Sequence, residues 1–345
     1  MATFKIAVMT APETVELVDW EKPELMPDEI GVRVRACAIC TSEMGVYRGE
    51  RGGRYPAYMG HEIVATVDAI GPLVRNNVKV GDRVSVSRIN RCGQCAACRK
   101  NQDNRCLNIR SQHRPGRPPG PGGFAEYMVV PGYQVFKLAA DSDLASSALV
   151  EPVACCIGSI DKGNVTFGDT VVVVGGGVMG LLHTALLRQR GARVVVSEPE
   201  ADRREKALAY GADHVVEPQD VAALVKDLTE GVGAEAVFVT SGPPQLVPEV
   251  FAYTAGGGRV VIYTSYYQPG GAQVPIDINA LHYAEHHLIG TVSPSRNDFA
   301  RAVNLVSHRH VDLSGLVAGT MPLASINDAF KKAIVPGTFR VIVTM

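Results

Sequence analysis

The sequence lacks a large net charge of either sign, a long hydrophobic run and an apolar leader. Its 34 basic and 35 acidic residues give a net charge of −1, so we expect neither nucleic acid nor an anionic membrane as a partner. The strongest apolar run covers residues 171–174, whereas a membrane-spanning helix needs roughly 18 such residues. Residues 1–14 contain no continuous apolar segment, which predicts no signal peptide and a cytoplasmic location.

The composition predicts a soluble globular chain with more than one domain. Hydrophobic residues make up 46% of the 345 residues, charged residues make up 20%, and the mean hydropathy is +0.07. This is enough apolar material for a large core, and it excludes a disordered chain. A chain of this length is expected to form about two domains.

The first 150 residues have the pattern of an antiparallel β domain. Residues 30–36 alternate apolar and polar side chains, as strands with one buried face do. Residues 63–70 and 83–86 look similar and are separated by Gly-Pro and Gly-Asp turns. Residues 114–123 (RPGRPPGPGG) are basic and rich in proline. Two interpretations of them stay open: a loop that borders a substrate cleft and accepts an anionic or polyhydroxy group, or a solvated loop.

Strands and helices alternate in the next part of the chain. A possible helix at residues 144–160 is followed by a continuous β-branched strand at 170–174, an apolar helix at 178–190 and a second strand at 193–197. This alternation predicts a parallel, doubly wound sheet. After about residue 290 the pattern returns to short mixed elements and ends in an expected strand at 339–344.

Four of the eight cysteines lie close together. They form the pattern C-x2-C-x2-C-x7-C at Cys92, Cys95, Cys98 and Cys106. Short spacers let neighbouring thiolates converge on one ion, and the longer loop supplies the fourth tetrahedral ligand. Four thiolates leave no position for a substrate, so we expect a structural zinc lobe over residues 88–110. The alternatives are disulfides, unmetallated thiols or an iron–sulfur cluster, which more often has a three-residue last spacer followed by proline.

A glycine-rich loop follows the expected strand at residues 170–174. Gly175, Gly177 and Gly180 form the pattern G-x-G-x-x-G, with Val178 and Met179 opening the next helix. The first glycine permits a tight turn, the second lets the backbone approach a pyrophosphate, and the third allows close packing of helix on strand. We therefore predict a dinucleotide-binding loop, against the alternative of an ordinary glycine turn.

The residue after the next strand bears on the choice of cofactor. Glu198 follows the first glycine at about the 20-residue spacing expected of a carboxylate on the adenosine ribose. A carboxylate there repels a 2′-phosphate, which favours NAD over NADP. Arg203 and Arg204 follow on the next helix, where they are either helix surface or contacts to a phosphate.

Four short motifs accompany these features: residues 60–62 (GHE), 80–84 (VGDRV), 122–127 (GGFAEY) and 151–152 (EP). Together they make the chain similar to the medium-chain, zinc-dependent alcohol dehydrogenase superfamily over essentially its whole length. The Glu-Pro pair resembles the branch of polyol, sugar and threonine dehydrogenases. The resemblance implies an α/β fold with a GroES-like, β-rich catalytic domain at residues 1–150, a Rossmann NAD-binding domain at 151–290, and a C-terminal return at 291–345 that completes the first domain.

The resemblance also implies a catalytic zinc ion, which makes two zinc ions per chain. Its ligands would be Cys40, His61 and Glu151, with Glu62 as an alternate or exchanging ligand. Three protein ligands leave a fourth position for water or a substrate oxygen, and such an ion lowers the pKa of an alcohol. Ser42 matches the hydroxyl that relays the proton in the family. The alternative for Cys40 is a redox C-x-x-C pair with Cys37.

Three positions depart from the family pattern. Glu43 stands where relatives use an aspartate to orient the histidine ligand, so the ligand cage is expected to shift by the extra methylene. Gly45 and Gly158 stand where many relatives have histidines. We therefore expect water to carry the proton to solvent.

The predicted function is that of an NAD-dependent zinc dehydrogenase acting on a secondary alcohol of a small polar molecule. A polyol, sugar or cyclitol is the first choice of substrate, and a threonine-type hydroxy-amino acid or an amino-alcohol is the second. The alternatives are a zinc-free, NADPH-dependent quinone or enoyl reductase and a non-catalytic nucleotide-binding protein. The family resemblance implies a homodimer or homotetramer.

Overall fold

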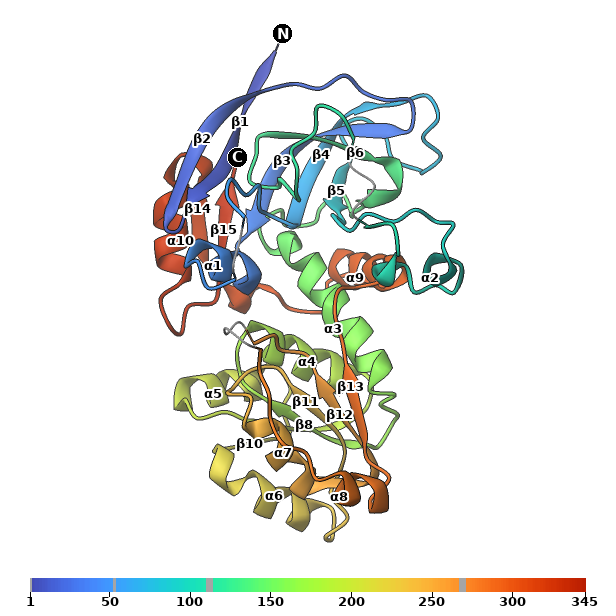
Figure 1. Cartoon of the computed structure of the whole chain (residues 1–345), viewed down its shortest axis with the longest axis vertical. Helices are drawn as coiled ribbons and strands as arrows, with labels where there is room; N and C mark the ends of the chain where they lie inside the picture. The colour runs from blue at the N-terminus through green and yellow to red at the C-terminus, as the bar shows by residue number, and fades with distance from the viewer. Residues whose placement is uncertain (1, 52–53, 110–113, 267–270) are drawn as a thin grey trace. The chain divides into compact units, whose positions relative to one another are not determined.

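The computed structural model describes residues 2–51, 54–109, 114–266 and 271–345, which form two compact units (Figure 1). The first unit comprises Met1–Ala154 and Pro294–Met345, and the second comprises Cys155–Ser293. The first unit therefore takes its residues from both ends of the chain, drawn in blue and in red, whereas the second is one continuous segment.

The first unit is built on a seven-stranded sheet with the order β14-β15-β3-β4-β5-β7, and β6 also pairs with β3. The strands are β3 (Glu29–Ala38), β4 (Glu62–Ile70), β5 (Arg83–Val86), β6 (Tyr127–Pro131), β7 (Val135–Lys137), β14 (Val317–Pro322) and β15 (Arg340–Thr344). All neighbours are antiparallel except β14 and β15. The expected strands at 30–36, 63–70 and 83–86 are present as β3, β4 and β5.

The final strand of the chain is what completes this sheet. Strand β15 pairs antiparallel with β3, with Val343 opposite Cys37, so the C-terminal segment belongs to the first unit. A separate two-stranded sheet pairs β1 (Thr3–Ala11) with β2 (Thr14–Glu21). The helices of this unit are α1 (Thr41–Tyr47), α2 (Ala96–Arg99), α9 (Arg296–Ser307) and α10 (Ile326–Ala333).

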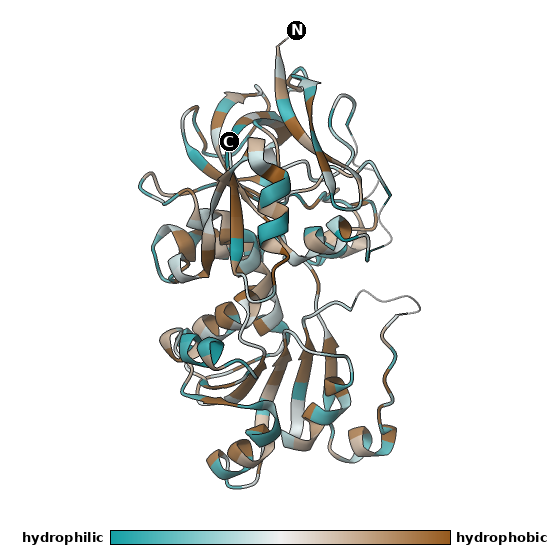
Figure 2. Ribbon diagram, turned by 90° about the vertical axis from the view of Figure 1, so that its left-hand side faces the viewer, coloured by the Kyte–Doolittle hydropathy of each residue, from teal (hydrophilic) through white to brown (hydrophobic). Residues whose placement is uncertain are grey.

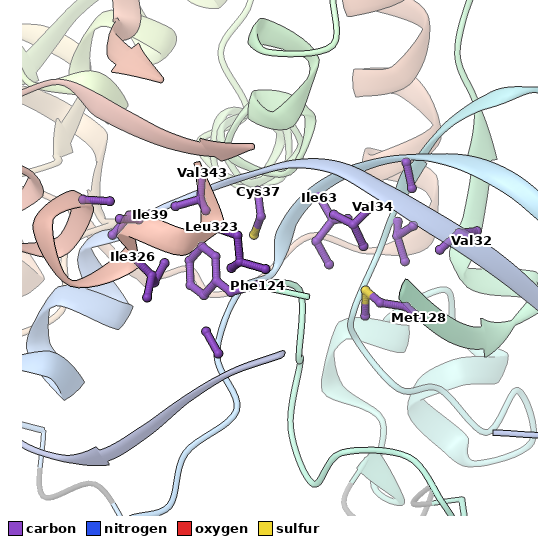
Figure 3. Close-up of a cluster of buried hydrophobic side chains, with 14 of the residues drawn as sticks. Val32, Val34, Cys37, Ile39, Ile63, Phe124, Met128, Leu323, Ile326 and Val343 are labelled. Atoms are coloured by element: carbon purple, nitrogen blue, oxygen red, sulfur yellow. The ribbon is translucent and has the colours of Figure 1, made fainter. Parts of the chain in front are cut away.

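Alternating side chains of the central strands form the core of the first unit. Val32 and Val34 from β3 and Ile63 from β4 are fully or almost fully buried. They belong to the same cluster as Phe124, and Figure 3 shows these side chains beside one another. Each such side chain stabilises the fold by about 1.5–3 kcal/mol. This core holds the ends of β3 and β4 in place.

The second unit contains a six-stranded parallel sheet with the order β10-β9-β8-β11-β12-β13. Its strands are β8 (Thr170–Val174), β9 (Arg193–Ser197), β10 (His214–Val216), β11 (Ala234–Val239), β12 (Thr254–Ile262) and β13 (His287–Gly290). Its helices are α4 (Val178–Gln189), α5 (Ala201–Ala209), α6 (Val221–Leu228), α7 (Leu246–Glu249) and α8 (Ile278–Tyr283). Numbered within the unit, the strand order is 3-2-1-4-5-6, the order of a doubly wound dinucleotide-binding sheet.

The central strands of this sheet are buried on both faces. Strand β8 (TVVVV) has every residue buried, and Figure 2 shows the strands of this sheet largely in the brown of hydrophobic residues. Continuous apolar runs of this kind are typical of parallel strands covered by helices on both sides. The predicted α/β fold is therefore confirmed.

Helix α3 (Val150–Lys162) includes the boundary between the units and follows a short 3₁₀ helix at Ser146–Leu149. The expected helix at 144–160 thus begins later, at residue 150. Among the described residues, no helix combines the length and the apolar character that crossing a bilayer would require.

Candidate metal centres and glycine-rich loop

The ends of two neighbouring strands bring Cys40, His61 and Glu62 together. Ala38, at the end of β3, pairs with Glu62, at the start of β4, so residues just after β3 and just before β4 meet at one end of the sheet. The ligand atoms of the three side chains lie within 4.8 Å of one another. A thiolate, an imidazole and a carboxylate are ligands that zinc accepts, and three protein ligands leave one position open. The residues present therefore fit a catalytic zinc ion.

Glu43 joins the cysteine and the histidine of this group. It is fully buried, and its carboxylate accepts hydrogen bonds from the Cys40 amide at 2.7 Å and the Gly60 amide at 3.1 Å. Its Oε1 also lies 2.5 Å from His61 Nδ1, which leaves Nε2 of the imidazole for an ion. Glutamate at this place reaches both ligands because it is the third residue of α1, whose N-cap is Cys40.

The electrostatics of His61 depend on the same carboxylate. Burial alone lowers the pKa of His61, but the charge of Glu43 and contacts with Cys40 raise it well above the usual value. Since a metal binds neutral imidazole, an ion held by this group would displace the extra proton. Hydrogen bonding at Nδ1 fixes the ring orientation that such binding needs.

Arg340, from the first position of β15, pairs with the carboxylate of Glu62. Its Nη2 donates to Oε1 at 2.8 Å and its Nε donates to Oε2 at 3.1 Å, while Nη2 also lies 3.7 Å from Cys40 Sγ. Both side chains of the ion pair are almost fully buried. Burial raises the pKa of Glu62 and Arg340 opposes this shift. Arg340 was not among the residues predicted from the sequence, where its only signal is a lone charge at the start of an apolar strand.

The four clustered cysteines form a second group, in the first unit. Their sulfur atoms all lie within 4.8 Å of one another, with Cys106 Sγ 3.6 Å from Cys92 Sγ and 4.0 Å from Cys95 Sγ. A tetrahedron with metal–sulfur bonds of roughly 2.3 Å has edges of roughly 3.8 Å, so these separations suit a zinc ion and are far too long for disulfides. Residue 110, the last of the expected lobe, lies outside the described residues.

Hydrogen bonds already favour the thiolate form of Cys92. The Gln94 amide, the Asn108 side chain and the Cys95 amide lower the pKa of Cys92 to about 6. The lobe is anchored by an ion pair of Arg91 with Asp103 at 2.8 Å. Four thiolates would fill a tetrahedral shell and leave no open position, as in structural zinc sites.

The glycine-rich loop connects β8 to α4 in the second unit. Gly175 has a φ of +102°, and a Cβ at Gly180 would lie 1.8 Å from the Gly175 carbonyl oxygen, so both positions require glycine. A Cβ at Gly177, the N-cap of α4, would meet no atom within 4 Å. Open space at the start of a helix is what a pyrophosphate needs, and the loop therefore fits a dinucleotide.

Comparison with known proteins agrees with this geometry. Residues 26–140 match the alcohol dehydrogenase GroES-like domain and residues 178–308 match the zinc-binding dehydrogenase family. L-threonine 3-dehydrogenase of Pyrococcus horikoshii is 34% identical over 273 residues, which cover 77% of this chain and 76% of the relative. The chain belongs to the zinc-dependent medium-chain alcohol dehydrogenase superfamily. It is an oxidoreductase of the class that acts on CH–OH donors with a nicotinamide cofactor.

Two further proteins resemble this dehydrogenase along most of its length. The 2-dehydro-3-deoxy-L-galactonate 5-dehydrogenase of Pseudoalteromonas atlantica is 31% identical and covers 88% of this chain and 87% of its own. The solved structure of a protein described as a zinc-binding dehydrogenase from Sinorhizobium meliloti, bound to NADP, is 28% identical, with a TM-score of 0.88 and full coverage of both chains. The superfamily acts on small alcohols, and its members commonly form oligomers.

The other predicted residues of the dehydrogenase site lie on α1 and α3. Among the described residues, the mutually close ligand atoms include Glu62 and not Glu151, although the charge of Glu151 is close enough to raise the pKa of Glu62. Ser42 is half-buried in the first turn of α1. Gly45 is buried in α1 and Gly158 is half-buried in α3.

Glu198 lies against the glycine-rich loop of the dehydrogenase. It is 3% exposed, and its Oε2 accepts a hydrogen bond from the Gly176 amide at 2.6 Å. Arg204 donates to the main-chain oxygens of Glu198 and Pro199 and to the carboxylate of Glu217, the residue after β10, so it holds the local backbone. The stem of Arg203 lies beside Gly176. Val178 and Met179 begin α4, as the motif predicts.

Proposed function

We propose that this dehydrogenase oxidises a secondary alcohol on a small polar molecule of the polyol, sugar or cyclitol type to a ketone, reversibly, with NAD as the hydride acceptor. The proposal rests on the group of three possible metal ligands formed by Cys40, His61 and Glu62. Two buried side chains hold this group: Glu43 pairs with His61, and Arg340 pairs with Glu62. The hydride leaves from the carbon of the alcohol, and the hydroxyl proton leaves to the protein.

Residues of the first unit have separate roles in the proposed reaction. Cys40 and His61, with Glu62 or Glu151, would hold a zinc ion, which supplies Lewis-acid chemistry that lowers the pKa of an alcohol. Glu43 fixes the imidazole, and Arg340 balances the buried charge of Glu62. The hydroxyl of Ser42 takes the departing proton and passes it on to water. The four cysteines of the lobe would hold a second, structural zinc ion.

A screen of NAD reduction tests the proposal. It covers polyols, sugars, inositols, amino-alcohols and simple secondary alcohols, each with NAD and with NADP. We expect turnover on polyhydroxy secondary alcohols. L-threonine is the second candidate substrate, favoured by the similarity to L-threonine 3-dehydrogenase. No turnover on any alcohol, with quinone or enone reduction by NADPH instead, would refute the dehydrogenase assignment.

Glu198 is the residue that we propose selects NAD. Its buried carboxylate lies beside the loop where the dinucleotide would bind, and a negative charge there repels the 2′-phosphate of NADP. Glu198→Ala should lower the preference for NAD over NADP, measured as the ratio of kcat/KM values, by roughly tenfold or more. Glu205→Ala, at an exposed position of α5, is the control. An unchanged ratio in Glu198→Ala would mean that another residue reads the ribose.

We further propose that the enzyme is a homodimer that pairs through β13. This strand is an edge of the six-stranded sheet, and its Leu288 is 43% exposed. Two copies of an open edge can pair antiparallel about a two-fold axis. Light scattering should give the mass of two chains for the wild type and for Leu208→Lys, an exposed site on α5. Leu288→Lys should give one chain, and a dimer that survives this change contradicts the interface.

A further inference from the structure

A cavity of about 440 Å³ in the first unit has a strongly basic lining that the proposed metal centres do not use. The charged residues that line it are Arg88, Arg114, Arg117 and Glu29, and prolines of the loop at 118–121 form much of the remaining wall. Its volume lies within the usual range for small-molecule sites, roughly 300–1,000 Å³. Three guanidinium groups therefore line it together with one carboxylate.

Arg88 brings a positive charge without a counter-charge. Its Nε and Nη2 donate to the carbonyl oxygens of Pro121 at 2.7 Å and Gly120 at 3.1 Å, and its Nη1 donates to Gln134 Oε1 at 2.7 Å. These partners are neutral, and no carboxylate of the described chain pairs with Arg88. Burial lowers its pKa to about 10, so the group stays charged at neutral pH. A guanidinium has five N–H donors, so donors remain for a ligand.

The other two arginines are held rigidly by acidic residues. Arg117 pairs with the fully buried Glu29, and Arg114 pairs with both oxygens of Asp28 at 2.7 and 2.8 Å and with Glu29 at 3.2 Å. Glu29 is thereby neutralised, and the excess charge of the lining is positive.

Arg88 and His61 follow from one pair of neighbouring strands. Ile63 of β4 pairs with Val86 of β5 in an antiparallel ladder. His61 precedes Ile63 by two residues and Arg88 follows Val86 by two. Both residues therefore lie at the same end of this ladder, whereas two other lining residues, Glu29 and Pro131, pair at the start of β3, the end of that strand away from Cys40.

We propose that this cavity binds the carboxylate or phosphate group of an anionic, hydroxyl-bearing small molecule, and that this molecule is the substrate of the dehydrogenase. The second half of the proposal rests on the proposed function. Arginine is suited to planar, charge-assisted recognition of either anion, and the proline wall packs against the carbon skeleton. The contacts of Arg114 and Arg117 with buried Glu29 show that residues 114–117 pack on the protein, which argues against the interpretation of residues 114–123 as a solvated loop.

Binding can be measured without turnover. The single tryptophan, Trp20, donates its indole N–H to the Gly116 carbonyl at 3.1 Å, within the arginine loop, so its fluorescence reports on the cavity. We expect saturable binding of inorganic phosphate and of gluconate to the zinc-loaded enzyme, weakened by added KCl, and no such response to sorbitol. No saturable binding of either anion, or binding that is independent of salt, would overturn the proposal.

Variants of Arg88 test whether gluconate binds in this cavity, without any measurement of turnover. Arg88→Gln should weaken gluconate binding at least about tenfold, and Arg88→Lys should recover part of it. Arg75→Gln, which removes an exposed arginine that donates only to main-chain carbonyls, should bind as the wild type does. Equal binding by wild type and a folded Arg88→Gln would contradict the site.

Kinetics test whether the bound anion is the substrate. With an anionic alcohol found in the screen, Arg88→Gln should raise KM at least about tenfold with little change in kcat, and it should leave KM for neutral alcohols unchanged. An equal rise in KM for neutral alcohols would refute the anion role. Binding of gluconate through Arg88 by a chain that oxidises no alcohol would instead refute the dehydrogenase function and leave the anion site standing.

Discussion

Cys40→Ser is expected to lower kcat by at least roughly a thousandfold, because a lost ligand removes several kcal/mol of stabilisation from the reacting alcohol. The zinc content should fall from two ions per chain to one, since the four-cysteine group is separate from Cys40. The glycine-rich loop lies in the other unit, so NAD binding measured by calorimetry should be retained. Metal analysis and calorimetry together distinguish a lost ion from a lost fold.

Two other cysteines serve as comparisons for this result. Cys155→Ser, at a half-buried position of α3, should keep both zinc ions and wild-type activity. Cys92→Ser should lose the other ion, and with it much of the stability of the lobe. A Cys40→Ser enzyme with normal activity would show that this thiolate holds no catalytic metal, and the ligand assignment would fail.

Arg340→Met should destabilise the enzyme by about 3–5 kcal/mol, because it leaves the buried carboxylate of Glu62 without its cation. Glu62→Gln in the same chain should restore much of that loss, since the amide carries no charge to be compensated. Urea denaturation of the two single variants and of the double variant gives the coupling energy between the residues. Arg301→Met, at an exposed position of α9, is the matched control.

The stability of the double variant decides whether Arg340 acts through its charge or through its packing. If the double variant is as unstable as Arg340→Met alone, the effect of Arg340 comes from packing of its stem and not from its charge. Restored stability would assign to Arg340 the task of keeping an ionised carboxylate beside Cys40 and His61. Zinc content, measured on the same samples, shows whether each change also alters the metal group.

Local patterns in the sequence were sufficient for much of the fold. The run at residues 170–174, the three glycines that follow it and the next strand at 193–197 lie within one βαβ unit, and spacing alone indicated their order. The four clustered cysteines lie within one short segment, and their sulfur atoms meet in the structure. In both cases, residues near in sequence make the contacts, so periodicity and spacing carry the information.

Contacts between distant segments were beyond the reach of such patterns. Arg340 and Glu62 are 278 residues apart, and they meet because β15 pairs with β3 and β3 pairs with β4. The site of Arg88 depends in the same way on a loop that returns past β5. Glu43 was recognised as a departure from the family, but the three contacts of its carboxylate follow from its place in the first turn of α1.

The central claim is that the Cys40 group holds a metal ion with an open position. The most direct test is to replace zinc by cobalt and to titrate the protein with imidazole, a neutral ligand, while recording the visible absorption of cobalt. We expect a saturable spectral change in the wild type and in Cys155→Ser that is absent in Cys40→Ser. A cobalt spectrum that imidazole leaves unchanged in the active wild-type enzyme would contradict the claim.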